Sequence, residues 1–332
     1  MSRQGKFRPR TLKNIKIFWN KEAKEWGDDP RVTIRDHYFR LLQMETVLPL
    51  IKGRQKVLDI GCGSGFSSIF YAQVVKELIG IDYAKDMMKC ARRFLNDSNY
   101  FNQIMKKYSF EKKPKLKRNI LFEQGDILNI KFSNSAFDTV ITERVLVNLP
   151  TRSLQDKALS EVARILQPGG LWTLAEATQQ GREYTDKLRK KFDLSILERY
   201  WHNLYLDEIR FENILNKMNF SILEIKRFET YQFLTRVIHP LIVWPEEPKF
   251  LVGFNNAARI ISKEYLDYKH VSEIGLKSFL QEVFRPLVIK YDPDKLSRYD
   301  EVVNHILVVN PNFSNCSHHV FYLLRKNKND EY

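Results

Sequence analysis

The chain has 332 residues, with 54 lysines and arginines against 40 aspartates and glutamates, which gives a formal net charge of +14. Its 43% of apolar residues can form a large core, so wholesale disorder is excluded, and the length allows two domains or one elaborated α/β domain. Three well-separated cysteines exclude a disulfide framework and a CxxC zinc site. With no secretory signal and no apolar run of the ~18 residues that a membrane helix needs, we expect a cytoplasmic protein without a membrane span.

The first half of the chain alternates between helical and strand patterns. Helical spacing of apolar residues predicts helices within residues 1–50, interrupted at Asp28-Asp29-Pro30. Residues 56–60 form a short apolar run that ends in glycines, which is typical of a strand buried on both faces of a parallel sheet. Further strands are predicted at 78–81, 120–122, 139–141 and 171–174, with helices at 67–76, 84–94 and 154–166 between them. This alternation predicts a doubly wound α/β sheet.

The alternation loosens after residue 175. Residues 180–218 are predicted to be helical, and residues 220–228 to form a sixth strand. Residues 240–315 are expected to be a helical insertion, followed by a last strand at 319–324.

Alternating glycines follow the first strand at positions 61, 63 and 65, and a helix is predicted directly after them. Glycine is needed where the backbone turns with positive φ or where a ligand comes too close for a Cβ atom. Asp59 lies two residues before Gly61, and a carboxylate there would repel a pyrophosphate but suits an ammonium or sulfonium cation. The motif therefore favours a ligand-binding loop over a tight turn without a ligand.

Two more acids follow the next two strands. Asp82 ends the second strand, 17 residues after Gly65, close to the ~20-residue spacing at which an acid binds ribose hydroxyls in nucleotide-binding folds. The alternative is that Asp82 caps the helix that begins near Ala84. Asp126 follows the third strand, where a carboxylate can accept the amino group of an adenine while Ile127 packs on the ring, unless this segment is a simple turn.

In this order, the motifs resemble class I S-adenosylmethionine-dependent methyltransferases. The resemblance covers residues 55–180, and more faintly the last two strands, through Asp59-x-Gly61-x-Gly63-x-Gly65, Gly80-Ile81-Asp82 followed by Met87-Met88, Gly125-Asp126, Phe137-Asp138 and Leu166-Gln167-Pro168-Gly169-Gly170. It implies a Rossmann-like seven-stranded sheet with a reversed last strand, and S-adenosyl-L-methionine as cofactor. It implies cofactor contacts by Asp59, Gly61, Gly63, Gly65, Asp82, Tyr83, Met87, Asp126, Ile127 and Thr142.

The chain departs from two subtypes of that family. Thr142-Glu143-Arg144 stands where enzymes that methylate amino groups of DNA bases carry Asn/Asp-Pro-Pro-Tyr/Phe, which argues against that substrate. The sequence also lacks a His/Asp cluster like the metal site of catechol-type O-methylation, so no metal is predicted.

The acceptor is expected beyond the carboxyl ends of the strands. Glu143 and Arg144 end a buried strand, where they either act on the acceptor, pair with each other or cap the next helix. His202 is the best candidate base, because its pKa can lie near neutrality, although packing among inserted helices explains it equally well. His318 and His319 are a weaker alternative, and one of them should point outward. The predicted substrate contacts are Asn148, Glu176, Gln179, Trp201 and Tyr205.

The resemblance also suggests how the chain is divided. Residues 1–50 would form an N-terminal helical lid, in which Arg35 either pairs with the cofactor carboxylate or is a surface cation. Residues 51–180 would form the cofactor-binding core. Residues 181–332 would supply a substrate cap, helical insertions and the last two strands.

The resemblance implies methyl transfer by in-line displacement to an oxygen or nitrogen atom of a small molecule or a sugar or glycan precursor. An RNA-modifying methyltransferase and an inactive, cofactor-binding regulatory protein are the alternatives. The basic charge is local, because residues 1–25 carry eight basic and two acidic side chains, and residues 106–118 carry seven and one. These segments supply 12 of the 14 net charges, so an anionic partner such as RNA would meet them and not the nearly neutral remainder.

Overall fold

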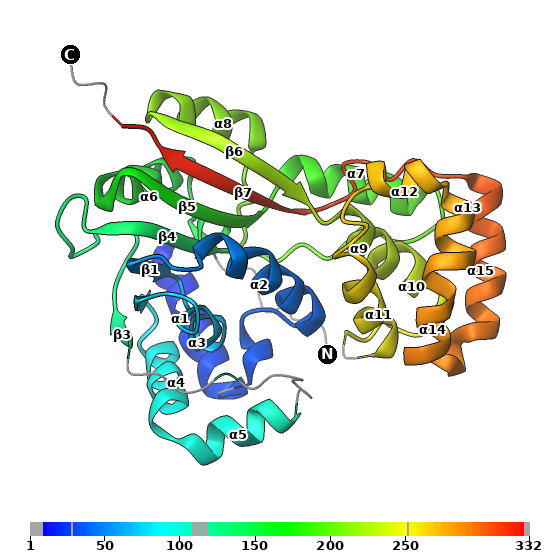
Figure 1. The fold of residues 1–332 in the computed structure, drawn as a ribbon, viewed down its shortest axis with the longest axis horizontal. Helices are drawn as coiled ribbons and strands as arrows, with labels where there is room; N and C mark the ends of the chain where they lie inside the picture. Colours follow the sequence, from blue (N-terminus) through cyan, green and yellow to red (C-terminus); the bar gives the residue numbers. More distant parts are fainter. Residues whose placement is uncertain (1–8, 28, 108–113, 115–118, 251, 329–332) are drawn as a thin grey trace.

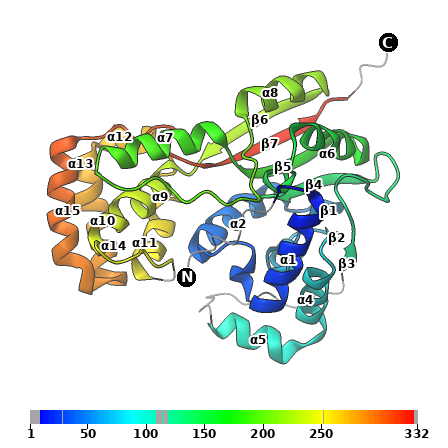
Figure 2. The same ribbon diagram turned by 180° about the vertical axis from the view of Figure 1, so that it is seen from behind.

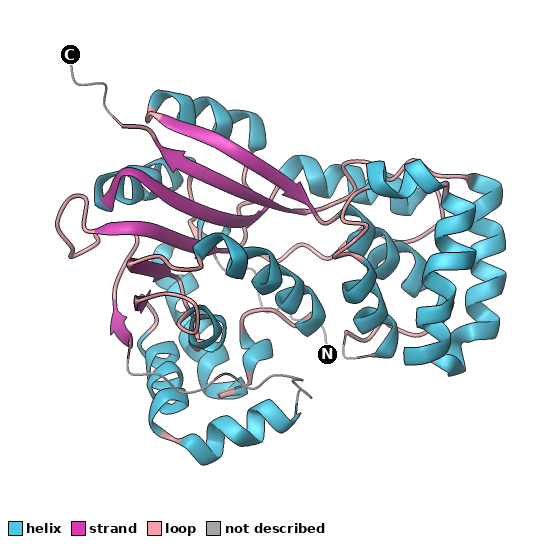
Figure 3. Ribbon diagram, in the orientation of Figure 1, coloured by secondary structure: helices cyan, strands magenta, loops and turns pink. Residues whose placement is uncertain are grey.

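The computed structural model describes residues 9–27, 29–107, 114, 119–250 and 252–328. Seven strands form one sheet in the order β3-β2-β1-β4-β5-β7-β6, and β7 runs antiparallel to both of its neighbours (Figure 3). The strands are β1 (Lys56–Ile60), β2 (Glu77–Asp82), β3 (Ile120–Gln124), β4 (Phe137–Glu143), β5 (Leu166–Ala177), β6 (Phe220–Arg227) and β7 (His319–Lys326). This confirms the expected Rossmann-like sheet with a reversed last strand.

Apolar side chains alternate along the central strands, and both faces of the sheet are covered. Val57 and Leu78 join one core cluster, whereas their neighbours Leu58 and Ile79 join the other. The first cluster packs against α2 (His37–Ile51), α3 (Phe66–Tyr71) and α4 (Lys85–Asn96), and the second packs against α6 (Arg152–Ile165) and α8 (Glu208–Lys217). A period of two with both sets apolar is what a doubly covered sheet requires.

A helical cap separates β6 from β7 in the chain. It lies beyond one end of these two strands, on the right of Figure 1. Its elements are α9 (Glu229–Phe233), the π-helix η3 (Leu234–Ile238), α10 (His239–Val243), α11 (Gly253–Ile261), α12 (Tyr268–Ile274), α13 (Leu276–Ser278), the π-helix η4 (Phe279–Phe284), α14 (Arg285–Tyr291), η5 (Pro293–Lys295) and α15 (Leu296–Val309). The cap thus begins about ten residues before the predicted insertion, because helix resumes directly after β6.

The N-terminal region forms two helices joined by a short turn. Thr11 caps α1 (Leu12–Trp26) by accepting the N–H of Asn14, and Asp36 caps α2 by accepting the N–H of Phe39. The turn η1 (Pro30–Val32) begins at the proline that was expected to break the helical stretch. Helix α1 packs against α4 (Figure 2).

The region predicted as helix over 180–218 is instead two helices separated by a loop. Helix α7 (Gln179–Lys190) ends near Asp193, which has a φ of 54°, and α8 begins after its cap Asp207. Residues 191–207, here called the aromatic loop, are held by α7, since Arg182 donates to the carbonyl oxygens of Leu197 and Glu198. These hydrogen bonds from arginine to backbone carbonyls stabilise a loop where a helix was predicted. Helical periodicity in the sequence does not reveal them.

Some elements of the structure were not predicted, and part of the chain lies outside the described residues. The helix α5 (Ser98–Lys107) and the short turn η2 (Leu146–Asn148) were not predicted. Most of the basic segment 106–118, like residues 1–8, lies outside the described residues. Among the helices that are described, none is long and apolar enough to cross a membrane.

Candidate active site

A cavity of about 1120 Å3, here called the central cavity, lies at the carboxyl ends of the parallel strands. Its lining includes residues that directly follow β1, β2, β3 and β4, together with residues of α1, the aromatic loop and the cap. Open α/β sheets bind their ligands at this edge. The predicted site residues are therefore expected to line this cavity.

The glycine loop is the turn of residues 61–65, of which Gly61, Cys62 and Gly63 line this cavity. Gly61 and Gly63 have φ angles of 72° and 56°, which favour glycine. A Cβ atom on Gly61 would lie 2.4 Å from a methyl of Val145, and one on Gly63 would lie 2.6 Å from a methyl of Thr33. Positive φ and close packing against Val145 and Thr33 thus both require glycine at these two positions. Gly65 does not line the cavity, because it caps α3 and faces Phe122.

Asp59 lies in β1 just before the glycine loop and lines the cavity. Its carboxylate accepts the hydroxyl of Ser68 at 2.6 Å. Burial raises the pKa of Asp59 to about 8, while the hydrogen bond from Ser68 lowers it. A cation placed beside Asp59 would relieve this cost of ionisation, which fits the expected preference for a cationic ligand.

Asp82 joins the end of β2 to the glycine loop. One carboxylate oxygen accepts the N–H of Ala84 at 2.8 Å, and the other accepts the N–H of Gly63 at 3.2 Å. The capping alternative is therefore present in the structure, yet Asp82 also lines the cavity, beside Tyr83 and Met87. Burial raises its pKa to about 6, against the effect of the two backbone hydrogen bonds.

Asp126 and Ile127 line the same cavity after β3. A carboxylate oxygen of Asp126 accepts the N–H of Leu128 at 2.9 Å, so the predicted turn exists as well. The three acids Asp59, Asp82 and Asp126 thus stand along the edge formed by β1, β2 and β3, around the glycine loop.

The N-terminal helices cover this part of the cavity. Trp19 of α1 donates its indole N–H to Oδ1 of Asn148 at 3.1 Å. Arg35 lines the cavity and lies over the ring of Trp26, with 5.4 Å from the guanidinium carbon to the ring centroid. A cation is therefore present at this wall, where a ligand carboxylate could meet it.

Glu143 and Arg144 both line the cavity but do not pair with each other in the way that was one expectation. Glu143 accepts the hydroxyl of Tyr71 at 2.6 Å, and Arg144 donates to the side-chain oxygen of Gln43 at 2.5 Å. Arg144 has a φ of 59°, a left-handed conformation that is rare for an arginine and more frequent at functional sites.

His202 is buried in the aromatic loop and lines the cavity. Its ring stacks on Phe18 of α1, with centroids 4.4 Å apart, and lies 5.8 Å from the ring of Tyr200. His318 and His319 both line the cavity, so the expectation that one of them points outward is wrong. The ring of His319 packs between Phe39 and His318, with centroid distances of 4.9 and 4.3 Å.

Besides Gly65, four predicted contacts lie away from the cavity lining. Glu176 is fully buried and accepts the N–H groups of Val145, Leu146 and Val147, so it holds the loop after β4. The Thr142 hydroxyl accepts the indole N–H of Trp172 inside the core. The remaining two, Gln179 and Trp201, are turned elsewhere: Gln179 is exposed and bonded to Glu183, and Trp201 packs edge-on against Phe18 and His202. These four assignments are corrected.

Asn148 and Tyr205 do line the cavity. The Asn148 side chain bridges the indole of Trp19 and the carbonyl of Arg144, and the Tyr205 hydroxyl accepts a hydrogen bond from Arg182 at 2.8 Å. Arg182, Arg189 and Arg236 are lining residues that were not predicted. The spacing of seven between Arg182 and Arg189 places them on one helix face, but nothing in the pattern around Arg236 distinguishes it.

Comparison with known proteins agrees with this geometry. Residues 58–174, about a third of the chain, match a family profile described as a methyltransferase domain. The chain is 30% identical over 135 residues to an uncharacterized methyltransferase of Schizosaccharomyces pombe, a match that covers 40% of this chain and 43% of the relative. It is also 30% identical over 132 residues to the demethylmenaquinone methyltransferase of Staphylococcus carnosus, covering 39% and 46%.

The chain thus spans less than half of the length of these curated relatives. One solved structure is similar over nearly the whole chain, a complex between the Haloferax volcanii Trm112 methyltransferase activator and a methyltransferase. The TM-score is 0.51 at 13% identity, covering 94% of this chain and 98% of the other. At this identity the likeness shows the fold alone.

Proposed function

We propose that this protein transfers a methyl group from S-adenosyl-L-methionine to an oxygen or nitrogen atom of a small molecule or a sugar or glycan precursor. Residues 58–174 match a methyltransferase domain, and the ordered motifs of the chain resemble those of class I S-adenosylmethionine-dependent methyltransferases. The observation that carries the proposal is that Gly61 and Gly63 of the glycine loop line the same cavity as Asp59 and Asp82. A second, positively charged part of the same cavity leaves room for an acceptor.

The lining residues fit the chemical groups of the cofactor. Asp59 would favour a cation beside the glycine loop, and Asp82 would accept ribose hydroxyls at the end of β2. Asp126 and Ile127 would meet the adenine, and Arg35 would meet the carboxylate of the methionine part. Residues 1–50 would then act as a lid on this half, with α1 held through the bond from Trp19 to Asn148.

When bound, S-adenosylmethionine supplies an electrophilic sulfonium methyl group, whose sulfur keeps the electron pair as the methyl passes to the acceptor. The residues of the chain have three tasks. The lid and the aromatic loop exclude water, and the cavity walls orient the acceptor for in-line attack. The buried His202 would take the proton from a hydroxyl acceptor as it attacks, or from an amine acceptor once the amine has received the methyl group.

Transfer of labelled methyl groups from S-adenosylmethionine to extract fractions tests this proposal. We expect label in the small-molecule fraction, with the product identified by mass, and a loss of labelling with Asp82→Ala. Label in the RNA fraction would favour the RNA-modifying alternative. Binding of S-adenosylhomocysteine without any labelled product would favour the inactive, regulatory alternative.

A further inference from the structure

Acidic residues at the strand ends and a group of arginines lie in different halves of the central cavity, and the N-terminal region adds Lys16 and Arg35 beside the acids. The carboxylates Asp59, Asp82 and Asp126 belong to β1, β2 and the turn after β3. The other half is lined by arginines from segments that follow β4, β5 and β6, here called the cationic cluster: Arg144, Arg182, Arg189 and Arg236. These strands end at the same edge, because Ala177 of β5 pairs with His319 and Arg227 of β6 pairs with Val320.

Hydrogen bonds within the cavity wall bring the cluster together. Arg182 and Arg189 are two turns apart on one face of α7, and both are buried. Arg189 donates to the backbone carbonyls of Ser195 and Arg236, which joins α7 to the cap. These bonds to neutral carbonyls fix the guanidinium groups without cancelling their charge.

Arg236 occupies the π-helix η3, a rare backbone form that is frequent at functional sites. Its Nη2 donates to a carboxylate oxygen of Asp36 at 2.6 Å. Its Nη1 is buried and has no hydrogen-bond partner among the described residues. A buried guanidinium donor without a partner is costly, and an anion in the cavity would satisfy it.

The carboxylates near the cluster do not balance it. Asp36 and Glu143 line the interior of this half, while Glu198 and Glu247 are exposed at its rim. Asp186 does not line the cavity. Its Oδ2 atom lies 3.8 Å from Nε of Arg182 and also forms an ion pair with the exposed Arg199. The four arginines therefore outnumber Asp36 and Glu143, the interior carboxylates of this half, although Arg144 also lies near Asp59.

The pKa values of the two histidines at the start of β7 are lowered by burial and by these arginines. Burial and the neighbouring arginines hold the pKa values of His318 and His319 well below the usual range, so both rings are neutral. The Nδ1 atoms of both are buried without a hydrogen-bond partner among the described residues. They add polar groups for a ligand without adding charge.

We propose that the methyl acceptor is a small anion, bound through a carboxylate or phosphate group by the cationic cluster. This inference rests on the proposed methyltransferase function and names the substrate class of the same site. Arginine is well suited to both groups, because its planar fork donates two parallel hydrogen bonds to a pair of anionic oxygens.

The test uses the full chain saturated with S-adenosylhomocysteine, so that the cofactor half is filled and cannot capture the probe. Benzoate, benzamide and inorganic phosphate are titrated by calorimetry at constant ionic strength. Benzoate and benzamide have the same shape and differ in charge. We expect benzoate or phosphate to bind and benzamide to bind at least tenfold more weakly, and the tighter anion identifies the recognised group.

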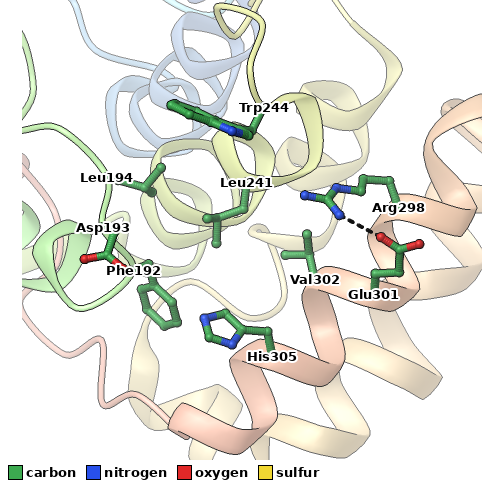
Figure 4. A pocket seen from close by; sticks show the side chains of 9 residues that line it. All are labelled: Phe192, Asp193, Leu194, Leu241, Trp244, Arg298, Glu301, Val302 and His305. Carbon is green, nitrogen blue, oxygen red and sulfur yellow. Dashed lines mark hydrogen bonds and ion pairs between the residues drawn. The ribbon is translucent and has the colours of Figure 1, made fainter.

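Substitutions locate the binding. Arg236→Gln should lower the affinity for the anion at least tenfold, while S-adenosylhomocysteine binds as before. Arg144→Gln should have the same effect, and this variant keeps the ion pair between Arg236 and Asp36. Arg298→Gln is the matched control, because Arg298 lines a separate hollow of about 400 Å3, where it pairs with Glu301 (Figure 4). It should leave anion binding unchanged.

Three results would overturn the inference: equal binding of benzamide, no binding of either anion, or equal weakening by Arg298→Gln. If S-adenosylhomocysteine binds and the anions do not, only the anionic acceptor is rejected. If S-adenosylhomocysteine does not bind, the proposed function fails and this inference fails with it.

Discussion

Trp19 of α1 and Asn148, which follows β4, are joined by a hydrogen bond of 3.1 Å from the indole N–H to Oδ1. This bond ties the N-terminal helix to a segment that lines the central cavity. Loss of one such neutral bond costs about 1 kcal/mol, or roughly a fivefold change in an equilibrium constant. We therefore expect Trp19→Phe to speed the dissociation of S-adenosylhomocysteine about fivefold in a stopped-flow chase. Trp244→Phe, at an exposed tryptophan of the second hollow, is the control and should leave the rate unchanged.

His202 can be tested as a base separately from its packing role. Phenylalanine keeps the stacking on Phe18 but removes both ring nitrogens. We expect His202→Phe to lower labelled-methyl transfer about 100-fold or more, the usual range for loss of a general base, with little change in the affinity for S-adenosylhomocysteine. Unchanged transfer would show that His202 acts in packing alone.

Asp59 should make the ligand-free protein less stable as the pH rises. Its pKa is about 8 in the folded chain and ~3.9 when unfolded, so between these values the folded state binds more protons. Its stabilising contribution is complete below pH ~4 and is lost as the pH approaches 8.

Comparison with Asp59→Asn isolates this effect, because burial raises the pKa values of Asp82 and Glu176 too, to about 6 and about 7. In urea titrations from pH 5 to 8, we expect the free energy of unfolding to fall more steeply for the wild type than for Asp59→Asn. Parallel curves would contradict the buried, protonated carboxyl group.

Glu176 should matter for stability and not for ligand contact. It accepts three backbone N–H groups of the loop after β4, and removing these acceptors leaves buried donors unpaired. We expect Glu176→Ala to lower the free energy of unfolding by about 3 kcal/mol or more in urea denaturation. Gln179→Ala, at an exposed residue nearby, should change it by less than about 0.5 kcal/mol.

The sequence was sufficient to predict the sheet and the acids that line the cavity beside the glycine loop, because both depend on local patterns. The runs around Val57 and Leu78 reveal buried strands, and the spacing from Asp59 to Asp82 follows one strand–helix–strand unit. The half of the cavity that holds the cationic cluster depends on contacts between distant segments. Glu176 and Thr142 are close in sequence to residues that line the cavity, but their side chains point into the core. There they accept hydrogen bonds from Val145 and Trp172.

Arg236 is a second residue whose place in the cavity could not be predicted from the sequence. It lies in a helical insertion without a recognisable motif, and it becomes part of the site only because the cap folds back beside Asp36, 200 residues earlier. No local periodicity encodes such a contact. The aromatic loop likewise depends on arginine bonds to backbone carbonyls that a helical pattern does not reveal.

Calorimetry with S-adenosylhomocysteine is the direct test of whether the chain binds S-adenosylmethionine through the glycine loop and Asp82. We expect binding at one site per chain, weakened at least tenfold by Asp82→Ala. Asp97→Ala is the matched control, because Asp97 also accepts a backbone N–H, that of Tyr100, but does not line the cavity. It should bind like the wild type. No binding to the wild type, or equal affinity in wild type and Asp82→Ala, would contradict the account.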